Sequence, residues 1–71
     1  MGTNEAKSIN LINIELNNIK KIFIKGFGID FPIDLNIVNS IHKDEENYYI
    51  TRKDKTITTW NTKRLIIEYN E

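Results

Sequence analysis

The stretch YYITRKDKTITTW, residues 48–60, contains the strongest structural signal in the chain. Its two halves are rich in aromatic and β-branched residues, which suit the pleated, half-buried surface of a sheet. The residues between them, 52–55, are polar, and the Asp54 side chain can accept hydrogen bonds from its own backbone in a turn. Two such runs around a short polar break predict a β-hairpin.

The register of this hairpin depends on its turn. A two-residue turn at Lys53-Asp54 places Ile50 opposite Ile57 and Tyr49 opposite Thr58. Because successive side chains point to opposite faces of a strand, one face then carries Tyr48, Ile50, Ile57 and Thr59, and the other carries Tyr49, Thr51, Thr56, Thr58 and Trp60. A slip of one residue would move one strand's whole set of side chains to the other face.

The residues that follow the hairpin predict one more strand. Residues 61–64 are polar and suit a tight turn, and residues 65–69 alternate in the way a half-buried strand does. This order of strand, hairpin, strand, short break and strand resembles the end of many small SH3-like and Sm-like barrels. We expect the core to contain Ile50, Ile57, Leu65 and Ile67, with Trp60 packed against it.

Residues 8–25 fit two interpretations. Residues 12–16 alternate in a strand pattern, Asn17-Asn18 suits a two-residue turn, and residues 20–25 then form a return strand. The alternative is one amphipathic helix, whose apolar stripe would be Ile9, Ile12, Leu16, Ile19 and Phe23. The many isoleucine and asparagine residues, which are poor helix formers, favour the two strands.

The middle of the chain predicts more short strands. Gly26-Phe27-Gly28 favours a turn, and residues 29–33 favour an edge strand because Pro32 has no N–H to donate. Residues 34–41 favour a strand, with Asp34 as the possible N-cap of a short helix. Residues 42–47 favour a solvated loop. Together these segments predict an all-β, mostly antiparallel fold. It would be a small SH3-like or Sm-like barrel or a compact sandwich of five to six short strands, with one N-terminal helix if the helical interpretation of residues 8–25 holds.

The composition of the 71 residues indicates one small domain, residues 8–71, after a disordered tail at residues 1–7. We recognise no internal repeat. The chain has no cysteine, which favours a cytoplasmic setting. It has no apolar run of membrane-spanning length, and no signal-peptide pattern is visible. Ten basic and ten acidic residues cancel, so net charge does not suggest a nucleic acid or a membrane partner.

Side chains for catalysis, a cofactor or a metal are not recognisable. His42 lies near Asp44, Glu45 and Glu46, but a flexible acidic loop does not hold three ligands in fixed geometry. Ser40 is too close along the chain to His42 to assume the geometry of a catalytic triad. Gly26-Phe27-Gly28 is not followed by the strand–turn–helix unit of a phosphate site. We therefore expect a protein that is not an enzyme.

Aromatic residues are the candidates for contact with a partner, because the chain has more large rings than one small barrel can bury. Phe27 lies between two glycines at a turn tip, where burial is difficult. Tyr48 and Tyr49 are adjacent, so one of them faces away from the core. The candidate contact residues are Phe27, Phe31, Tyr48, Tyr49 and Tyr69.

These features favour a non-enzymatic protein-interaction module that binds another protein or itself, most simply as a dimer. The Ile-, Asn- and Lys-rich composition resembles coding sequence of an AT-rich bacterium or its phage, which suggests an accessory protein that inhibits or regulates a host protein. A first alternative is a single-stranded nucleic-acid binder, which would use Lys20, Lys21, Lys25, Arg52, Lys53, Lys55 and Arg64. A second is an oligomer that holds a small, nucleotide-like ligand between its subunits.

Overall fold

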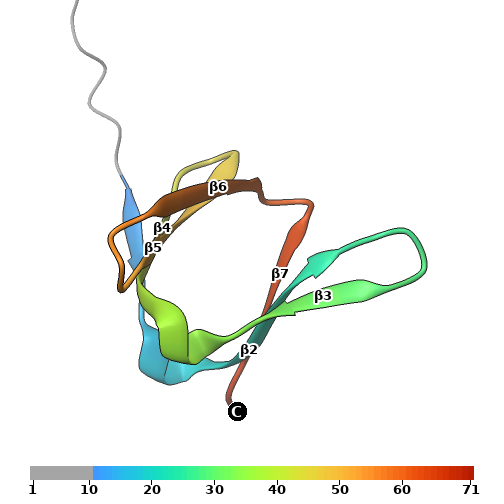
Figure 1. Ribbon diagram of the computed structural model, residues 1–71, viewed down its shortest axis with the longest axis horizontal. Helices are drawn as coiled ribbons and strands as arrows, with labels where there is room; N and C mark the ends of the chain where they lie inside the picture. The colour runs from blue at the N-terminus through green and yellow to red at the C-terminus, as the bar shows by residue number, and fades with distance from the viewer. Residues whose placement is uncertain (1–10) are drawn as a thin grey trace, which may run out of the picture.

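A computed structural model describes residues 11–71, which form two antiparallel sheets (Figure 1). The first sheet has the strand order β1-β4-β5-β6 and the second the order β3-β2-β7. The strands are β1 (Ile12–Ile14), β2 (Ile19–Lys25), β3 (Asp30–Ile33), β4 (Val38–Lys43), β5 (Asn47–Arg52), β6 (Ile57–Asn61) and β7 (Leu65–Tyr69), and the 3₁₀ turns are η1 (Leu16–Asn18) and η2 (Leu35–Ile37).

The predicted all-β, mostly antiparallel fold is confirmed, although residues 11–71 form seven strands and not five or six. These residues contain no α-helix, so the helical alternative for residues 8–25 is wrong over the described part of that segment. The two sheets pack into a small barrel-like sandwich that does not close. The disordered tail predicted for residues 1–7 lies outside the described residues.

The two N-terminal strands exist, but they do not pair with each other. The strand β1 pairs with β4, and β2 pairs with β3 and β7. The reason is the turn between them: Asn17 and Asn18 lie in η1, where the N–H of Asn18 donates to the carbonyl of Glu15 over 3.1 Å. This 3₁₀ turn bends the chain through a corner from one sheet to the other and does not reverse it.

The two interpretations of residues 34–41 are both partly correct. Asp34 caps the short 3₁₀ turn η2, where its side chain accepts from the N–H of Asn36 over 2.9 Å. The strand β4 then starts at Val38. The turn η2 is thus a second corner, which carries the chain from β3 in one sheet to β4 in the other.

The two corners reveal an internal repeat, so the expectation of no repeat is wrong. The segments that align are NIELNNIKKI, residues 13–22, and PIDLNIVNSI, residues 32–41. Each runs from a strand into a 3₁₀ turn and then into a second strand. The backbone agrees as well, because Glu15 has φ −71° and ψ 115° while Asp34 has φ −73° and ψ 113°. Sequence reading missed the repeat because only the apolar positions and the corner residues match.

The pairing of the strands follows the same repeat. The pair β1–β4 corresponds to β3–β2, and the pair β4–β5 corresponds to β2–β7. Even the irregularities agree, since the register shifts between Ile19 and Lys21 in one pair and between Val38 and Ser40 in the other. Within residues 11–71 the strand β6 has no counterpart, so the first sheet is one strand wider than the second there.

The hairpin predicted for residues 48–61 is present as β5 and β6, but its register differs from the prediction by one residue. Ile50 lies opposite Thr58, and Tyr48 lies opposite Trp60. The cause is a three-residue loop, in which Lys55 adopts φ 75° and the N–H of Arg52 donates to the carbonyl of Thr56 over 2.8 Å. The shift turns Ile57 outward, where 64% of its surface is exposed, so its predicted place in the core is wrong.

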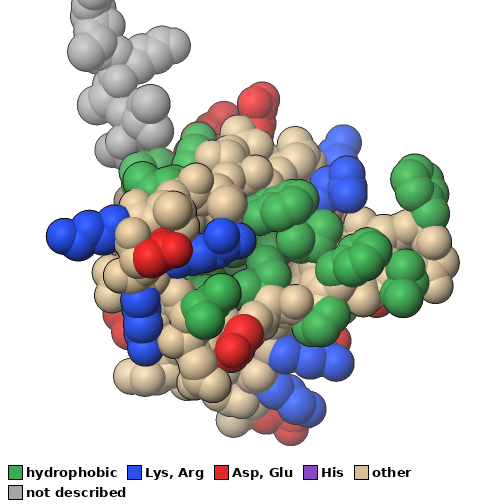
Figure 2. Space-filling view, viewed as in Figure 1, with side chains coloured by type: hydrophobic (Ala, Val, Ile, Leu, Met, Phe, Trp, Pro, Cys, Tyr) green, Lys and Arg blue, Asp and Glu red, His purple; other side chains and the backbone are tan. Residues whose placement is uncertain are grey.

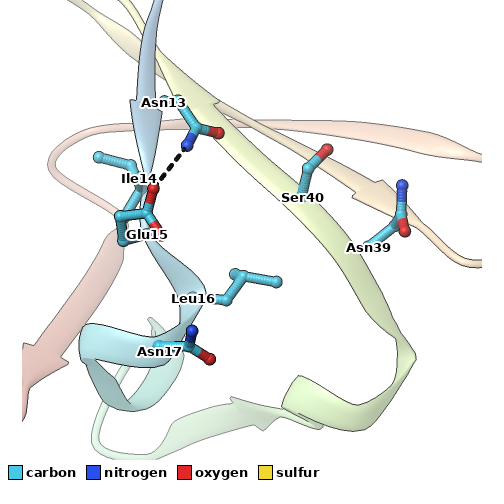
Figure 3. Close-up of a pocket in the computed structure, with 7 residues that line it drawn as sticks. All are labelled: Asn13, Ile14, Glu15, Leu16, Asn17, Asn39 and Ser40. Carbon is cyan, nitrogen blue, oxygen red and sulfur yellow. Dashed lines mark hydrogen bonds between the residues drawn. The ribbon is translucent and has the colours of Figure 1, made fainter.

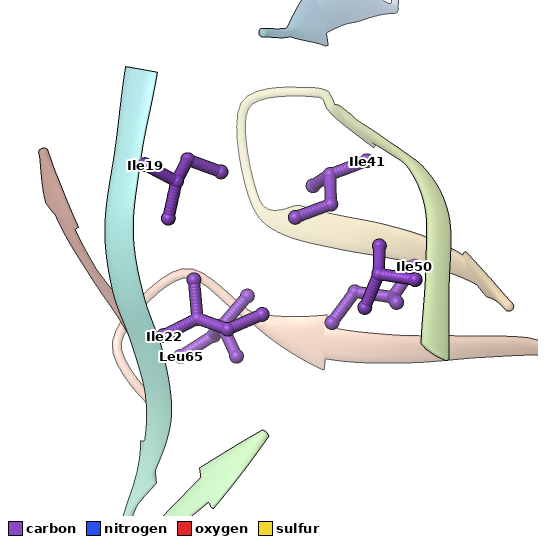
Figure 4. Close-up of a cluster of buried hydrophobic side chains, with 6 residues drawn as sticks. Ile19, Ile22, Ile41, Ile50 and Leu65 are labelled. Carbon is purple, nitrogen blue, oxygen red and sulfur yellow. The ribbon is translucent and has the colours of Figure 1, made fainter. Parts of the chain in front are cut away.

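Within residues 11–71, six buried side chains from both sheets make the core (Figure 4): Ile19, Ile22, Val38, Ile41, Ile50 and Leu65. The internal repeat contributes four of them, because Ile19 and Ile22 occupy the positions of Val38 and Ile41. The predicted core positions of Ile50 and Leu65 are confirmed. Ile67 and Trp60 are partly buried and pack against this core.

Candidate functional site

The hairpin formed by β2 and β3 projects from the body of the molecule (Figure 1). Its last paired residues are Lys25 and Asp30, and the loop between them is residues 26–29. The Phe27 side chain at the tip is fully exposed, and Ile29 and Phe31 are 62% and 54% exposed. Three large apolar side chains therefore face solvent on one short element.

Two glycines fix the shape of this tip. A Cβ atom on Gly26 would lie 2.4 Å from the carbonyl oxygen of Ile29 and 2.8 Å from Cε2 of Phe31. The loop backbone and the Phe31 ring can approach only because Gly26 has no side chain. Gly28 has φ 80°, a conformation that other residues rarely adopt. The position of Phe27 between them therefore follows from the turn geometry.

The apolar face of the core continues along the hairpin to its tip. Ile22 pairs with Ile33 and Ile24 pairs with Phe31, so all four side chains lie on the inner face of the sheet. Exposure grows outward along this face, from Ile22 at 1% to Phe31 at 54%. Figure 2 shows hydrophobic side chains in the centre of this view and on the projecting hairpin. We define Phe27, Ile29 and Phe31 as the hairpin tip patch.

The structure brings together two of the five predicted contact residues, Phe27 and Phe31. Tyr48 lies on the inner face of β5 and packs against the core, with Lys43 Nζ 5.4 Å from its ring centroid. Tyr49 faces outward and donates its hydroxyl hydrogen bond to Asp44. Tyr69, 52% exposed, lies at the end of β7. Sequence reading missed Ile29, whose only signal was its place between Gly28 and Asp30 in the same turn.

The Asp44 carboxylate organises the loop between β4 and β5. The loop is shorter than the predicted 42–47, because His42 and Lys43 belong to β4 and are half-buried. Asp44 accepts hydrogen bonds from the Tyr49 hydroxyl and from the N–H groups of Glu46 and Asn47. The Tyr49 hydrogen bond, and then the two N–H groups, lower the pKa of Asp44, and the same bond to the carboxylate raises the pKa of Tyr49. These hydrogen bonds hold the β4–β5 loop in shape, so we assign Asp44 and Tyr49 a structural role.

Side chains that could hold a metal do not converge in the part of the chain that is described: no group of three His, Cys, Asp or Glu residues comes together. Of the residues considered for such a site, His42 lies on β4, while Asp44, Glu45 and Glu46 lie in the loop, where Asp44 accepts hydrogen bonds from two backbone N–H groups and from Tyr49.

The basic residues of the nucleic-acid alternative do not form one surface. Lys20, Lys21 and Lys25 lie on β2, and Arg64 lies beside Lys25, whose carbonyl accepts from Arg64 Nε over 3.2 Å. Arg52, Lys53 and Lys55 lie at the β5–β6 turn of the other sheet. Figure 2 shows Lys and Arg side chains spread around the face in view, with acidic side chains among them.

A shallow pocket of about 310 Å³ lies at the η1 corner (Figure 3). It is polar, because it is lined by asparagine, serine and glutamate side chains together with Ile14 and Leu16: Asn13, Glu15, Asn17, Asn39 and Ser40. The Asn13 amide donates to the Glu15 carboxylate over 3.5 Å, and Asn17 and Asn39 are exposed to solvent. Sequence reading did not find this pocket, since Asn39 and Ser40 reach it only through the β1–β4 pairing.

Comparisons with protein-family models, with curated proteins and with solved structures found no match. Among residues 11–71, no helix has the length and the apolar character needed to cross a membrane. The function is therefore argued from the surface of the protein itself.

Proposed function

We propose that this protein is a non-enzymatic interaction module, which binds another protein by burying its hairpin tip patch in an apolar pocket of the partner. The observation that carries this proposal is the full exposure of Phe27 on an element that projects from the body. Within the single chain Phe27 is not buried, so its ring contributes no hydrophobic stabilisation to the fold. Burial of a phenylalanine against a partner contributes about 1.5–3 kcal/mol.

The anatomy of the tip supports such a contact. A few large anchors near the centre of an interface supply most of the binding energy, and aromatic rings are frequent among them. Phe27 and Phe31 are two such rings, and Ile29, between them in the sequence, is a third exposed apolar side chain of the hairpin. Because Gly26 and Gly28 fix the turn, the patch needs little reorganisation on binding, which lowers the entropic cost.

The biological role that fits best is that of a small accessory protein which inhibits or regulates a larger protein. The Ile-, Asn- and Lys-rich composition of the sequence supports a phage or another mobile element as its origin. The absence of cysteine from the sequence suits action in the cytoplasm. A projecting hairpin suits inhibition, since it can enter and block an apolar pocket of the target.

The test is capture of the partner from a lysate of the source cells, with three matched baits: the unaltered chain, Phe27→Ser and Ile57→Ser. Ile57 is the control, because it is also apolar and largely exposed but lies on the other sheet. We expect the unaltered chain and Ile57→Ser to retain the same protein and Phe27→Ser to lose it. Equal retention by all three baits, or no protein retained by any of them, would contradict the proposal.

The nucleic-acid alternative is separated by nuclease and by salt. Binding through Lys and Arg to phosphates releases counterions, so its affinity falls steeply as salt increases. An apolar contact through Phe27 responds little to salt. We expect the captured protein to remain after nuclease treatment and in higher salt. Loss of all binding under both conditions would favour the basic residues on β2 and at the β5–β6 turn instead.

A further inference from the structure

The outer edge of β7 is free in the described part of the chain. The order β3-β2-β7 puts β7 at the end of its sheet, and no strand within residues 11–71 pairs with its second side. The strand β6, which precedes β7, belongs to the other sheet, and the turn at residues 62–64 separates the two.

The backbone groups that face this edge can be assigned. The N–H of Lys25 donates to the carbonyl of Arg64 over 2.8 Å, and in an antiparallel ladder such bonded pairs alternate with non-bonded pairs. Ile66 opposite Phe23 is therefore bonded to β2, and Ile67 opposite Ile22 is not. It follows that the backbone groups of Leu65, Ile67 and Tyr69 point away from β2 toward the free edge.

The internal repeat shows what this edge looks like when it is covered. The strand β5 corresponds to β7, and Ile50 corresponds to Ile67, because their partners Ile41 and Ile22 occupy equivalent repeat positions. On β5, the strand β6 covers the edge and Ile50 is 1% exposed. On β7, where no equivalent strand is present in the described residues, Ile67 is only half-buried. The second sheet thus has a place for one more strand.

Two of the other free edges, those of β3 and β1, are less suited to pairing, and the free edge of β6 is the internal control in the test below. The edge strand β3 contains Pro32, which cannot donate to a ladder, and β1 has only three residues. The strand β7 carries the apolar Ile66, Ile67 and Tyr69. Its single charge, Glu68, lies 3.9 Å from Lys21 of its own sheet and faces away from the core. The strand β7 therefore has little of the charge that usually protects an edge strand from association.

We propose that β7 pairs with β7 of a second copy of this chain, antiparallel and around a twofold axis at Ile67. Leu65 then lies opposite Tyr69 of the second copy, and Ile66 opposite its Glu68. The three residues that present N–H and C=O groups at the edge, Leu65, Ile67 and Tyr69, are symmetric about Ile67, so every one of them finds a bonded partner. The formal net charge of zero means that two copies do not repel each other.

This dimer has a consequence for binding. The combined sheet has the order β3-β2-β7-β7-β2-β3, which puts the two projecting hairpins at its opposite ends. Two hairpin tip patches on one dimer allow a target with two sites to be held more tightly than either patch alone could hold it. The dimer itself rests on β7 and stands whether or not the tip binds a protein.

A charge test at one position decides the register. Ile66→Glu puts two pairs of like charges opposite each other across the dimer, between residue 66 and Glu68, whereas Ile66→Lys puts two opposite pairs there. Both variants lose the same apolar side chain. We expect sedimentation equilibrium between about 1 and 100 µM, the range for small interfaces, to show a dimer for the unaltered chain and for Ile66→Lys. The dissociation constant of Ile66→Glu should be at least about fivefold higher than that of Ile66→Lys.

Restoration and amide exchange complete the test. The double variant Ile66→Glu with Glu68→Lys should recover the dimer, because the opposite pairs are re-formed. In the unaltered chain, exchange of the Ile67 amide should slow as concentration rises, while exchange of the Thr59 amide, which faces the free edge of β6, should not change. A monomer at every concentration overturns the proposal, as does equal dissociation of the Lys and Glu variants, protection at Thr59, or loss of the dimer on removal of residues 1–10 alone.

Discussion

At the scale of single residues, Ile50 and Ile57 show how much a turn decides. They belong to the same hairpin and have the same side chain, yet Ile50 is 1% exposed and Ile57 is 64% exposed. The difference comes from the loop between them, where Lys55 adopts a left-handed conformation and Asp54 accepts from the N–H of Thr56 over 3.0 Å. One additional loop residue moves the whole of β6 by one position relative to β5.

Alanine at these two positions should therefore have very unequal effects on stability. Ile50→Ala removes a fully buried side chain and leaves a cavity, so we expect it to lower the free energy of unfolding by about 2–5 kcal/mol. Ile57→Ala is expected to change it by less than about 0.5 kcal/mol, as for most surface sites. Urea unfolding at one protein concentration measures both. Equal losses would show that the register of the β5–β6 hairpin is incorrect.

The Asp44 carboxylate makes stability depend on acid pH. Its pKa is lowered from 3.8 in the folded protein, chiefly by the Tyr49 hydroxyl and then by two N–H groups. A lowered folded-state pKa stabilises the protein above the unfolded value, and this contribution disappears as the pH falls through 3.8 toward the folded pKa. The pKa of Asp54 is lowered as well, chiefly by Thr56, so it adds to the same loss.

We expect Asp44→Asn to lower the melting temperature at pH 7 and to reduce its decrease between about pH 5 and pH 3. Tyr49→Phe removes only the largest of the contributions to the Asp44 pKa, so its pH dependence should lie between those of Asp44→Asn and the unaltered chain. Thermal melting followed by circular dichroism across this pH range checks the order. The same slope for all three proteins would mean that the Asp44 hydrogen bonds do not form.

At the scale of elements, the two 3₁₀ corners carry the chain between the sheets. Both end with a strand residue whose N–H donates back into the turn, to Leu16 in η1 and to Leu35 in η2. They differ in their first residue. Asp34 caps η2 through its side chain, whereas Glu15 makes no side-chain cap on η1, because its carboxylate stands one methylene further from the backbone.

This difference predicts a pair of opposite effects. Asp34→Ala removes a capping hydrogen bond and should lower the free energy of unfolding by about 0.5–2 kcal/mol. Glu15→Asp should create the equivalent cap on η1 and raise it by up to about 1 kcal/mol. Asp34→Glu is the matched control and should resemble Asp34→Ala. Chemical denaturation measures all three, and a loss of stability in Glu15→Asp would contradict the equivalence of the corners.

At the scale of the whole molecule, the fold is two similar halves that share one core. Ile22 and Ile41 hold equivalent places in these halves, at 1% and 0% exposure. Each also pairs with an apolar residue of the equivalent neighbouring strand, Ile22 with Ile67 on β7 and Ile41 with Ile50 on β5. Because the six core residues form one cluster, we expect the halves to unfold together.

The similarity of the halves predicts equal costs in the core. Ile22→Val and Ile41→Val each remove one methylene from an equivalent site, so each should lower the free energy of unfolding by about 0.5–1.5 kcal/mol. The two values should agree within about 0.5 kcal/mol, with one cooperative transition and an unchanged urea dependence. A second transition in either variant would show that the halves are independent units.

Local sequence patterns determined where the strands and most of the turns lie. Alternating β-branched and aromatic residues mark β5, β6 and β7, and Gly26 with Gly28 marks the hairpin that presents Phe27. Pro32 placed β3 at an edge, as observed. These signals are readable because strand alternation, glycine turns and proline act within a few residues along the chain. The exposure of Phe27 was predictable for the same reason.

Which strands pair, and on which face a side chain lies, was decided only by the tertiary structure. The Asn17-Asn18 pair suits a reversal as well as a corner, and only the pairing of β1 with β4 selects the corner. The inward or outward direction of Ile57 depends on one loop residue. The internal repeat became recognisable only from the matching corners and strand pairings, and the free edge of β7 depends on contacts between segments far apart in the sequence. Such contacts depend on how all the apolar faces fit together, which no local pattern encodes.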